Sequence, residues 1–131
     1  MNNIETTITE NALTPFSEGT PEGCGAVAEF WGIVRGEENG ESITALEYEA
    51  YRPMAERQMQ RIIGELLAEY PCEAVRVIHR IGVIPVGEAA IAVRVASRHR
   101  HASFSFLARF MDRLKQDVPI WKVRALTSAH R

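Results

Sequence analysis

The sequence has 131 residues, 46% of them hydrophobic, which is enough for one compact domain and too short for two ordinary ones. No apolar run approaches the roughly 18 residues that a membrane-spanning helix needs. The net charge of −2 is the sum of unequal parts: residues 1–93 carry six basic and fifteen acidic side chains, and residues 94–131 carry nine and two. The basic segment predicts an anionic partner, although it could equally pair with the acidic segment inside the fold. Cys24 and Cys72 form neither a metal-ligand spacing nor a disulfide framework, so we expect a reduced, cytoplasmic protein.

The N-terminal third predicts a lead-in followed by two strands. Residues 1–22 are polar and acidic, and we expect a loosely ordered or edge-pairing segment that precedes a single domain over residues 23–131. Residues 24–35 mix small, β-branched and aromatic side chains, which predicts a strand. The glycine-flanked, charged residues 36–41 predict a mobile loop. An imperfect alternation over residues 43–51 predicts the second strand.

The central part predicts a helix and two further strands. Pro53 opens a helix in which apolar residues recur at three- and four-residue steps, and Pro71 ends it. Residues 74–81 and 89–97 are rich in β-branched side chains and predict strands. The connector 82–87 contains a proline and two glycines, which favours a sharp bend over a continuous strand.

A second helix is predicted from near Arg100 to about Asp117, with an apolar stripe that indicates a core-facing side. Pro119 stops this helix, and residues 120–124 can form a short closing strand. The element order is therefore β, β, α, β, β, α, β. Two successive strand pairs lack an intervening helix, so the sequence predicts an α+β domain with a mainly antiparallel sheet.

Lysine usage is the first chemical signal. The chain has thirteen arginines but two lysines, Lys115 and Lys122, and these lie close together. Arginine stays protonated, whereas a lysine amine can lose its proton and act as a base or nucleophile. A helix stop and a turn separate the two lysines, so both amines can face one cleft. The alternative is chance survival of two lysines in an arginine-rich chain.

Two further places offer anion-binding groups. Arg35 ends the opening strand before the charged loop. Arg98, His99, Arg100 and His101 lie where a strand gives way to a helix, and free N–H groups at a helix start bind anions. Each of these side chains could instead be an ordinary surface residue. The two histidines lack a third ligand at a suitable spacing, so we expect no metal site.

Five segments of the chain carry a more specific signal: GAVAEFWGIVRG, ALEYEAY, VIHRIGVIPVGE, VASRHRHASF and MDRLKQDVPIWK. In this order and spacing, over about residues 23–124, they resemble the large, catalytic subunit of molybdopterin synthase. The resemblance implies an α/β-hammerhead fold, which is an α+β class with two main helices. It also implies that residues 23–131 are a catalytic domain.

The resemblance implies a sulfurtransferase of molybdenum cofactor biosynthesis that needs no cofactor of its own. Such enzymes move sulfur from the C-terminal thiocarboxylate of a small ubiquitin-like subunit to cyclic pyranopterin monophosphate, and so make the molybdopterin dithiolene. Two large subunits form a homodimer, and one small subunit binds each of them to give a heterotetramer. We expect a cytoplasmic enzyme with neither a membrane nor a nucleic acid as its partner.

The family's catalytic lysines fall on Lys115 and Lys122. Lys115 is expected beside the thiocarboxylate carbon, in proton transfer or transient acyl capture, and Lys122 is expected to hold phosphate or protonate a leaving oxygen. Val123 stands where the family usually has a second basic residue. Substrate contacts carried over from the family fall on Ile33, Val34, Arg35, His99, Arg100, Lys115, Lys122, Val123 and Arg124.

Two other functions remain open at this point. One is a non-catalytic paralogue or scaffold that binds the small subunit without forming product. The other is a nucleic-acid-binding module that uses the basic residues 94–131. Against the second, the aromatic residues fall on the apolar stripe of the predicted helix, and the net charge is slightly negative.

Overall fold

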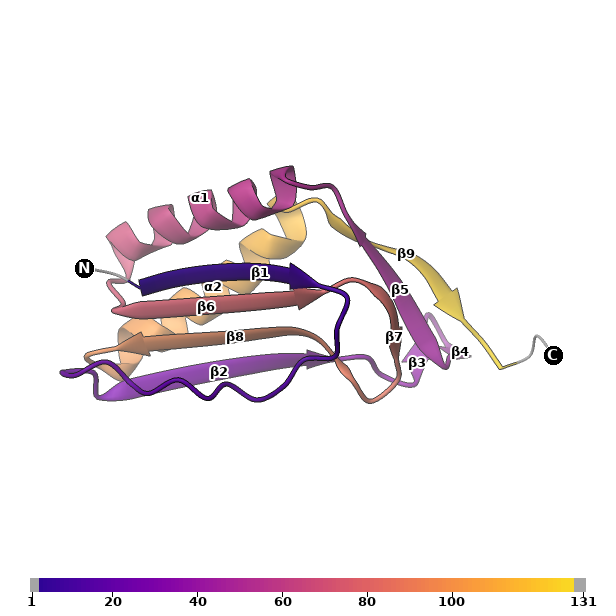
Figure 1. The fold of residues 1–131 in the computed structure, drawn as a ribbon, viewed down its shortest axis with the longest axis horizontal. Coiled ribbons are helices and arrows are strands. Elements are labelled where there is room, and N and C mark those ends of the chain that lie inside the picture. Colours follow the sequence, from indigo (N-terminus) through magenta and orange to yellow (C-terminus); the bar gives the residue numbers. More distant parts are fainter. Residues whose placement is uncertain (1–2, 129–131) are drawn as a thin grey trace.

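A four-stranded sheet forms the main layer of the computed structural model, which describes residues 3–128 (Figure 1). The strand order is β1 (Asn3–Thr9), β6 (Ala74–Arg80), β8 (Ala89–Ser97) and β2 (Ala26–Ile33). β6, β8 and β2 pair antiparallel, whereas β1 pairs parallel with β6. The N-terminal residues 3–9 therefore form one edge of the sheet.

Two helices, α1 (Met54–Glu69) and α2 (Arg100–Asp117), pack side by side against one face of this sheet (Figure 1). Their apolar stripes meet the inward-facing residues of β6 and β8, such as Val77 and Val93, in one buried core. Phe106 and Phe110 of α2 are fully buried there and stack at 6.3 Å. Two helices on a mainly antiparallel sheet confirm the predicted α+β class. In the described part of the chain, neither helix combines the length and the apolarity required to cross a membrane.

The opposite face of the sheet is crossed by the segment that connects β1 to β2 (Figure 1). Phe16 of this segment packs against Trp31 of β2 with a centroid distance of 5.6 Å. The Arg76 guanidinium lies 5.5 Å from the Phe16 ring and forms a 2.9 Å ion pair with Glu18. These contacts attach the polar lead-in to strands from the middle of the chain.

A second sheet lies across one end of the first (Figure 1). Its order is β7 (Gly82–Pro85), β5 (Ala45–Ala50) and β9 (Ile120–Leu126), and all its pairings are antiparallel. A small core of its own joins it to the end of the main sheet. The buried members of that core are Val34, Ile43, Leu46, Ile84 and Ala90.

Two short pieces of structure differ from the sequence-based predictions. Residues 36–41 were predicted as a loop, but β3 (Glu37–Glu38) and β4 (Glu41–Ser42) form a small hairpin there. Asn39 and Gly40 close the hairpin with φ of 54° and 82°, as a two-residue turn requires. The connector after β6 does bend, with Gly82 at φ 86°, but its first residues then pair with β5 as the strand β7.

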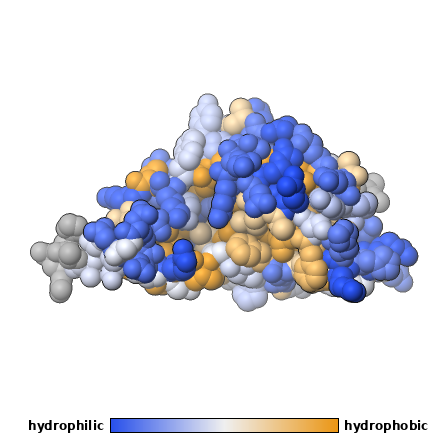
Figure 2. Space-filling view, turned by 180° about the vertical axis from the view of Figure 1, so that it is seen from behind, coloured by the Kyte–Doolittle hydropathy of each residue, from blue (hydrophilic) through white to orange (hydrophobic). Residues whose placement is uncertain are grey.

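Polar residues cover most of the surface on the side opposite to the view of Figure 1, with an apolar area along the lower middle (Figure 2). Several large apolar side chains are exposed in the described chain, among them Tyr51, Phe104 and Trp121. Trp121 lies in β9 and is half exposed.

Candidate active site

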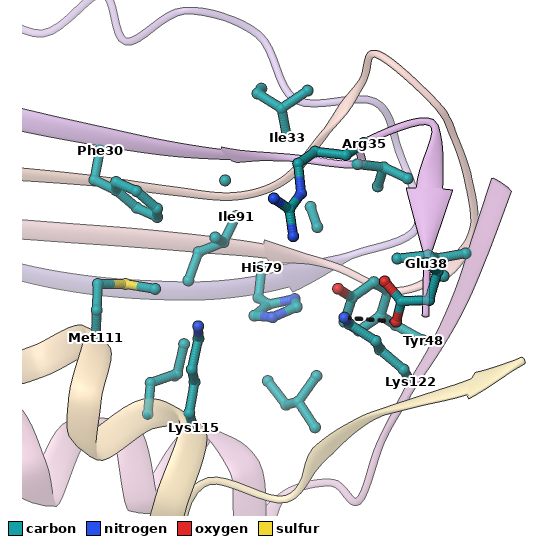
Figure 3. A pocket seen from close by; sticks show the side chains of 16 residues that line it. Phe30, Ile33, Arg35, Glu38, Tyr48, His79, Ile91, Met111, Lys115 and Lys122 are labelled. Atoms are coloured by element: carbon teal, nitrogen blue, oxygen red, sulfur yellow. Dashed lines mark hydrogen bonds and ion pairs between the residues drawn. The ribbon is translucent and has the colours of Figure 1, made fainter. Parts of the chain in front are cut away.

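A pocket of about 400 Å³ lies where the two sheets meet (Figure 3). Its size is typical of sites for small-molecule ligands. Strands of both sheets and the last turns of α2 contribute side chains to it. The lining residues are Phe30, Gly32, Ile33, Val34, Arg35, Glu38, Leu46, Tyr48, His79, Ala90, Ile91, Met111, Leu114, Lys115, Ile120 and Lys122.

Both lysines line this pocket because the chain reverses between them. Lys115 lies in the last turn of α2, and Lys122 lies in β9. The N–H of Val118 donates to the carbonyl of Leu114 at 3.2 Å and closes the helix, and Pro119 follows. The N–H of Tyr51, just beyond β5, then donates to the carbonyl of Pro119 at 3.0 Å and fixes the reversal against the second sheet. The two amines therefore approach the pocket from different layers of the fold (Figure 3).

The pocket carries more positive than negative charge. Lys122 Nζ donates to Glu38 Oε2 at 3.0 Å, so one lysine has a carboxylate partner. Within residues 3–128, neither Lys115 nor Arg35 forms an ion pair or a side-chain hydrogen bond. Two cations without partners at one pocket favour the binding of an anion.

Tyr48 and His79 are two titratable residues among the pocket residues that the sequence did not predict. Burial raises the pKa of the Tyr48 hydroxyl, with Lys122 opposing this shift and Glu38 adding to it. Burial lowers the pKa of the His79 imidazole, and a hydrogen bond to the Arg80 backbone opposes the shift in part. Both side chains therefore stay uncharged at neutral pH. Val75, Val77 and His79 alternate along β6 and share its buried side. A histidine at a position where the alternation predicts an apolar core residue is the sequence signal that could have pointed to His79.

Apolar side chains form the remaining wall of the pocket. Phe30 of β2, Ile91 of β8 and Met111 of α2 lie around the space in front of Lys115, whereas Ile33 of β2 lies farther from it, beside Arg35 (Figure 3). Phe30 and Ile33 are 39% and 49% exposed, although both are large and apolar. Val34 also lines the pocket and is buried. A ligand with a flat or apolar part and an anionic group would match this combination.

Four of the residues carried over from the family resemblance lie outside this pocket in the single chain. His99 and Arg100 are exposed at the start of α2, and fifteen residues of helix separate Arg100 from Lys115, which is roughly 22 Å. Val123 is an unpaired bulge residue in β9. Arg124 forms a 2.8 Å ion pair with Glu47 instead. One copy of the chain therefore brings together Ile33, Val34, Arg35, Lys115 and Lys122.

Neither a metal cluster nor a reactive thiol is found in the described part of the chain. Residues 3–128 contain no group of three His, Cys, Asp or Glu side chains placed to hold a metal ion. Burial raises the pKa of Cys72 to about 11, and it also raises the pKa of Cys24, with Glu73 adding to the shift of both thiols. Both cysteines therefore remain protonated at neutral pH, and neither lines the pocket. The chemistry available in the pocket is anion binding and proton transfer by lysine, arginine, tyrosine and histidine.

Fold and pocket together define a small α+β protein with a cationic, partly apolar site between two sheets. Comparison with known sequences gives the family: the family model described as MoaE protein matches residues 4–117. The chain therefore belongs to the MoaE protein family.

Individual relatives agree with this assignment. The chain is 42% identical over 99 residues to the molybdopterin synthase catalytic subunit of Homo sapiens, covering 76% of this chain and 53% of the relative. It is 42% identical over 98 residues to the Bacillus subtilis protein of the same name, and this match covers 75% of this chain and 62% of the relative. The chain thus spans about half the length of several curated relatives that it matches. Its fold is similar to the crystal structure of molybdopterin synthase from Staphylococcus aureus, with a TM-score of 0.83 and 31% sequence identity. The match covers 93% of this chain and 90% of the Staphylococcus aureus chain.

Proposed function

We propose that this chain is the catalytic subunit of a molybdopterin synthase. It would transfer sulfur from the C-terminal thiocarboxylate of a small ubiquitin-like subunit to cyclic pyranopterin monophosphate and so form the molybdopterin dithiolene. The names of the relatives suggest this activity, and the cationic pocket gives a physical reason to expect it in this chain.

The convergence of Arg35, Lys115 and Lys122 on one pocket is the observation that carries the proposal. The acceptor carries a cyclic phosphate and the donor carries a thiocarboxylate, so two anions have to share one site. At effective protein dielectric, repulsion between two such charges about 4 Å apart costs roughly 4 kcal/mol. Three cations, two of them without a carboxylate partner in residues 3–128, offset that repulsion.

Each group in the pocket has a proposed role. Lys115 lies beside the apolar wall and meets the thiocarboxylate carbon, where it takes part in proton transfer or transient acyl capture. Lys122 and Arg35 hold the phosphate, and Lys122 can protonate the oxygen that leaves when the cyclic phosphate opens. Ile33 and Val34 form the apolar side against which the flat pterin packs.

The proposal extends to a second copy of the chain and to the setting of the reaction. His99, Arg100, Val123 and Arg124 lie outside the pocket of their own chain, so they would contribute from a partner copy in a homodimer, within a heterotetramer that includes two small subunits. The unit that carries the chemistry would be residues 23–131, preceded by the lead-in 1–22. A cytoplasmic location is part of the proposal, and it is supported by two cysteines that form no disulfide.

Reconstitution tests the central proposal. The purified chain is mixed with thiocarboxylated small subunit and cyclic pyranopterin monophosphate, and dithiolene formation is followed with time. The expected result is turnover by the wild type. Binding of the small subunit without any product would instead favour the scaffold function. Strongly salt-sensitive binding to generic oligonucleotides would favour the nucleic-acid function.

Mixing two inactive variants tests the shared site. Lys115→Ala removes the pocket lysine of its own copy, and Arg100→Ala removes the group proposed to act from the other copy. If the site spans two copies, the mixture regains activity because each mixed dimer has one complete pocket. If activity stays absent although mixed dimers form, Arg100 does not act across the dimer.

A further inference from the structure

His79 occupies an unusual position for a histidine, at the point where the buried core opens into the pocket. It is 5% exposed and continues the inward-facing stripe of β6 after Val75 and Val77. Its ring lines the pocket together with Lys115, Lys122 and Tyr48. Burying an imidazole among cations is costly unless it is neutral, so a purely structural position would favour an apolar residue.

The hydrogen bonds of His79 determine which ring nitrogen carries the proton. Nδ1 lies 2.8 Å from the carbonyl oxygen of Arg80, and a carbonyl only accepts, so Nδ1 carries the hydrogen. In the neutral ring, Nε2 then has a free lone pair. No group within residues 3–128 donates to Nε2. The Tyr48 ring packs edge-on at 5.6 Å and fixes the plane of the imidazole.

Among the side chains that line this pocket, His79 is uncharged and has a free ring nitrogen, so it can accept a proton without first losing one. Lys115, Lys122 and Arg35 are donors in their charged forms. The carboxylate of Glu38 already accepts from Lys122 at 3.0 Å, and burial keeps the Tyr48 hydroxyl protonated. Figure 3 shows the His79 ring between Lys115 on one side and the Lys122–Glu38 pair on the other.

The proposed sulfur transfer requires such an acceptor. When the thiocarboxylate sulfur attacks the substrate carbon that carries an oxygen of the cyclic phosphate, a new carbon–sulfur bond forms, the carbon–oxygen bond to the phosphate breaks, and the phosphate oxygen leaves with the electron pair. The donor tail and the pterin are then joined through sulfur as a thioester, which keeps the acyl carbon–sulfur bond of the donor. Release of the tail needs water to add to the acyl carbon, with a carbon–oxygen bond forming and the carbon–sulfur bond breaking. The electron pair of that bond stays on the pterin sulfur, and the tail leaves as a carboxylic acid that ionises. A proton must leave the attacking water, and a cationic amine cannot take it.

We propose that Nε2 of His79 is the general base that takes this proton from water in each hydrolytic step, and then passes it to solvent. This inference rests on the proposed function and adds a residue to it. It adds one role to those proposed above: Lys115 meets the thiocarboxylate carbon, Lys122 and Arg35 hold the phosphate, and His79 activates the water. The Nδ1 bond to Arg80 orients the ring for this task, as the partner of a catalytic histidine does.

A single-turnover experiment with thiocarboxylated small subunit and cyclic pyranopterin monophosphate tests the inference. His79→Asn can keep a donor to the Arg80 carbonyl while it removes Nε2. We expect product formation to slow by about 100-fold or more, which is the usual contribution of a general base. Intact-mass analysis under acid should show a conjugate of small subunit and pterin that accumulates, and hydroxylamine should cleave it and release sulfurated pterin.

The control is Arg57→Asn, at an exposed position of α1 outside the pocket, which should behave as wild type. Turnover by His79→Asn within about twofold of wild type overturns the inference. Lost turnover without a conjugate, in a folded variant that still binds both reactants, also overturns it. If the Asn variant does not fold, His79→Ala with added imidazole replaces it: restored hydrolysis supports the role, and its absence in folded protein excludes the role. Failure of the wild type to form any dithiolene would instead reject the proposed function itself.

Discussion

Lys122 and Glu38 lie 84 positions apart in the sequence, yet their side chains meet in a 3.0 Å ion pair at the edge of the pocket. The β3–β4 hairpin brings the carboxylate to the lysine, and the lysine is the group proposed to hold phosphate. A bound phosphate would have to displace this carboxylate or share the amine with it. The Lys122 side chain is 49% exposed and the Glu38 side chain is 24% exposed, so the contribution of this ion pair to stability is small, about 0.2–1 kcal/mol.

Glu38→Gln should strengthen phosphate binding in the pocket. The amide keeps the size of the side chain but removes a negative charge that competes with the ligand for Lys122. We expect the Kd for cyclic pyranopterin monophosphate to fall about two- to fivefold, measured by calorimetry. Glu37→Gln, next in the chain and outside the pocket, is the matched control and should leave the Kd unchanged. Weaker binding by Glu38→Gln would mean that the carboxylate contacts the ligand directly.

Lys115→Ala should abolish turnover while the small subunit still binds. The amine has no carboxylate partner within residues 3–128, so its removal leaves no buried charge behind. We expect kcat to fall by about 100-fold or more. Lys115→Arg keeps the positive charge but removes an amine that can lose its proton, so it should remain impaired. Recovery of turnover by the Arg variant would show that Lys115 acts through charge alone.

The stability of the fold should decrease as pH falls below the ordinary titration range of histidine. The pKa of His79 is lowered in the folded chain, mainly by burial, so the unfolded chain binds more protons between the folded value and about 6.5. The stabilising contribution of neutral His79 is fully present above that pH and is lost as pH falls towards the folded pKa. The charged groups that line the pocket around the ring are Lys115, Lys122, Arg35 and Glu38.

Urea unfolding at pH 7.5 and at pH 5.5 measures this effect. Wild type should lose more free energy of unfolding between the two pH values than His79→Asn does. Most carboxylates titrate below this window, so the difference between the two proteins isolates the histidine. Equal losses in the two proteins would contradict a lowered pKa at His79.

Gly25→Ala should destabilise the turn that leads into α2. The Gly25 N–H donates to the carbonyl of Arg98 at 3.1 Å, and a Cβ at this position would lie 2.8 Å from that same oxygen. Both contacting groups are backbone, so neither can move aside without disturbing the β2–β8 pairing. We expect a loss of about 1–3 kcal/mol in the free energy of unfolding.

Gly64→Ala is the natural comparison for this substitution. Gly64 lies in the middle of α1, and a Cβ there would have nothing within 4 Å. Alanine should therefore stabilise the protein by about 0.4–1 kcal/mol, through helix propensity and reduced freedom of the unfolded chain. Chemical denaturation of both variants measures the change in the free energy of unfolding. We expect a decrease for Gly25→Ala and an increase for Gly64→Ala.

The long elements were predictable because their apolar residues repeat with a clear period. Both helices were predicted close to their observed ends, and Pro53, Pro71 and Pro119 mark three of those four ends in the sequence. The shorter pieces were not predictable: β3, β4 and β7 each have four residues or fewer, which is too short for a period to be read. Their pairing depends on partners elsewhere in the chain.

Site residues were predictable from the sequence where a residue type was rare in the chain. They were not predictable where the surrounding residues followed the pattern of an ordinary core strand. Two lysines in an arginine-rich chain pointed to Lys115 and Lys122, and the position of Arg35 at the end of a strand made it a candidate anion-binding residue. The family resemblance added Ile33 and Val34. His79 lies in a strand that alternates as a core strand does, so only its chemical type distinguished it from Val75 and Val77. For His99 and Arg100, the single chain offers no pocket contact, because a whole helix separates them from Lys115.

The turn at Val118 and Pro119 has a consequence for how such a protein could be altered. The Lys115 amine is carried by α2, which packs on the main sheet, and the Lys122 amine is carried by β9 of the second sheet. The distance between the two amines therefore depends on the turn that connects α2 to β9. Inserting a single residue into that turn would change the distance between the two amines without replacing any side chain of the pocket. Selectivity for reactants of different size could therefore be adjusted at a position that never touches them.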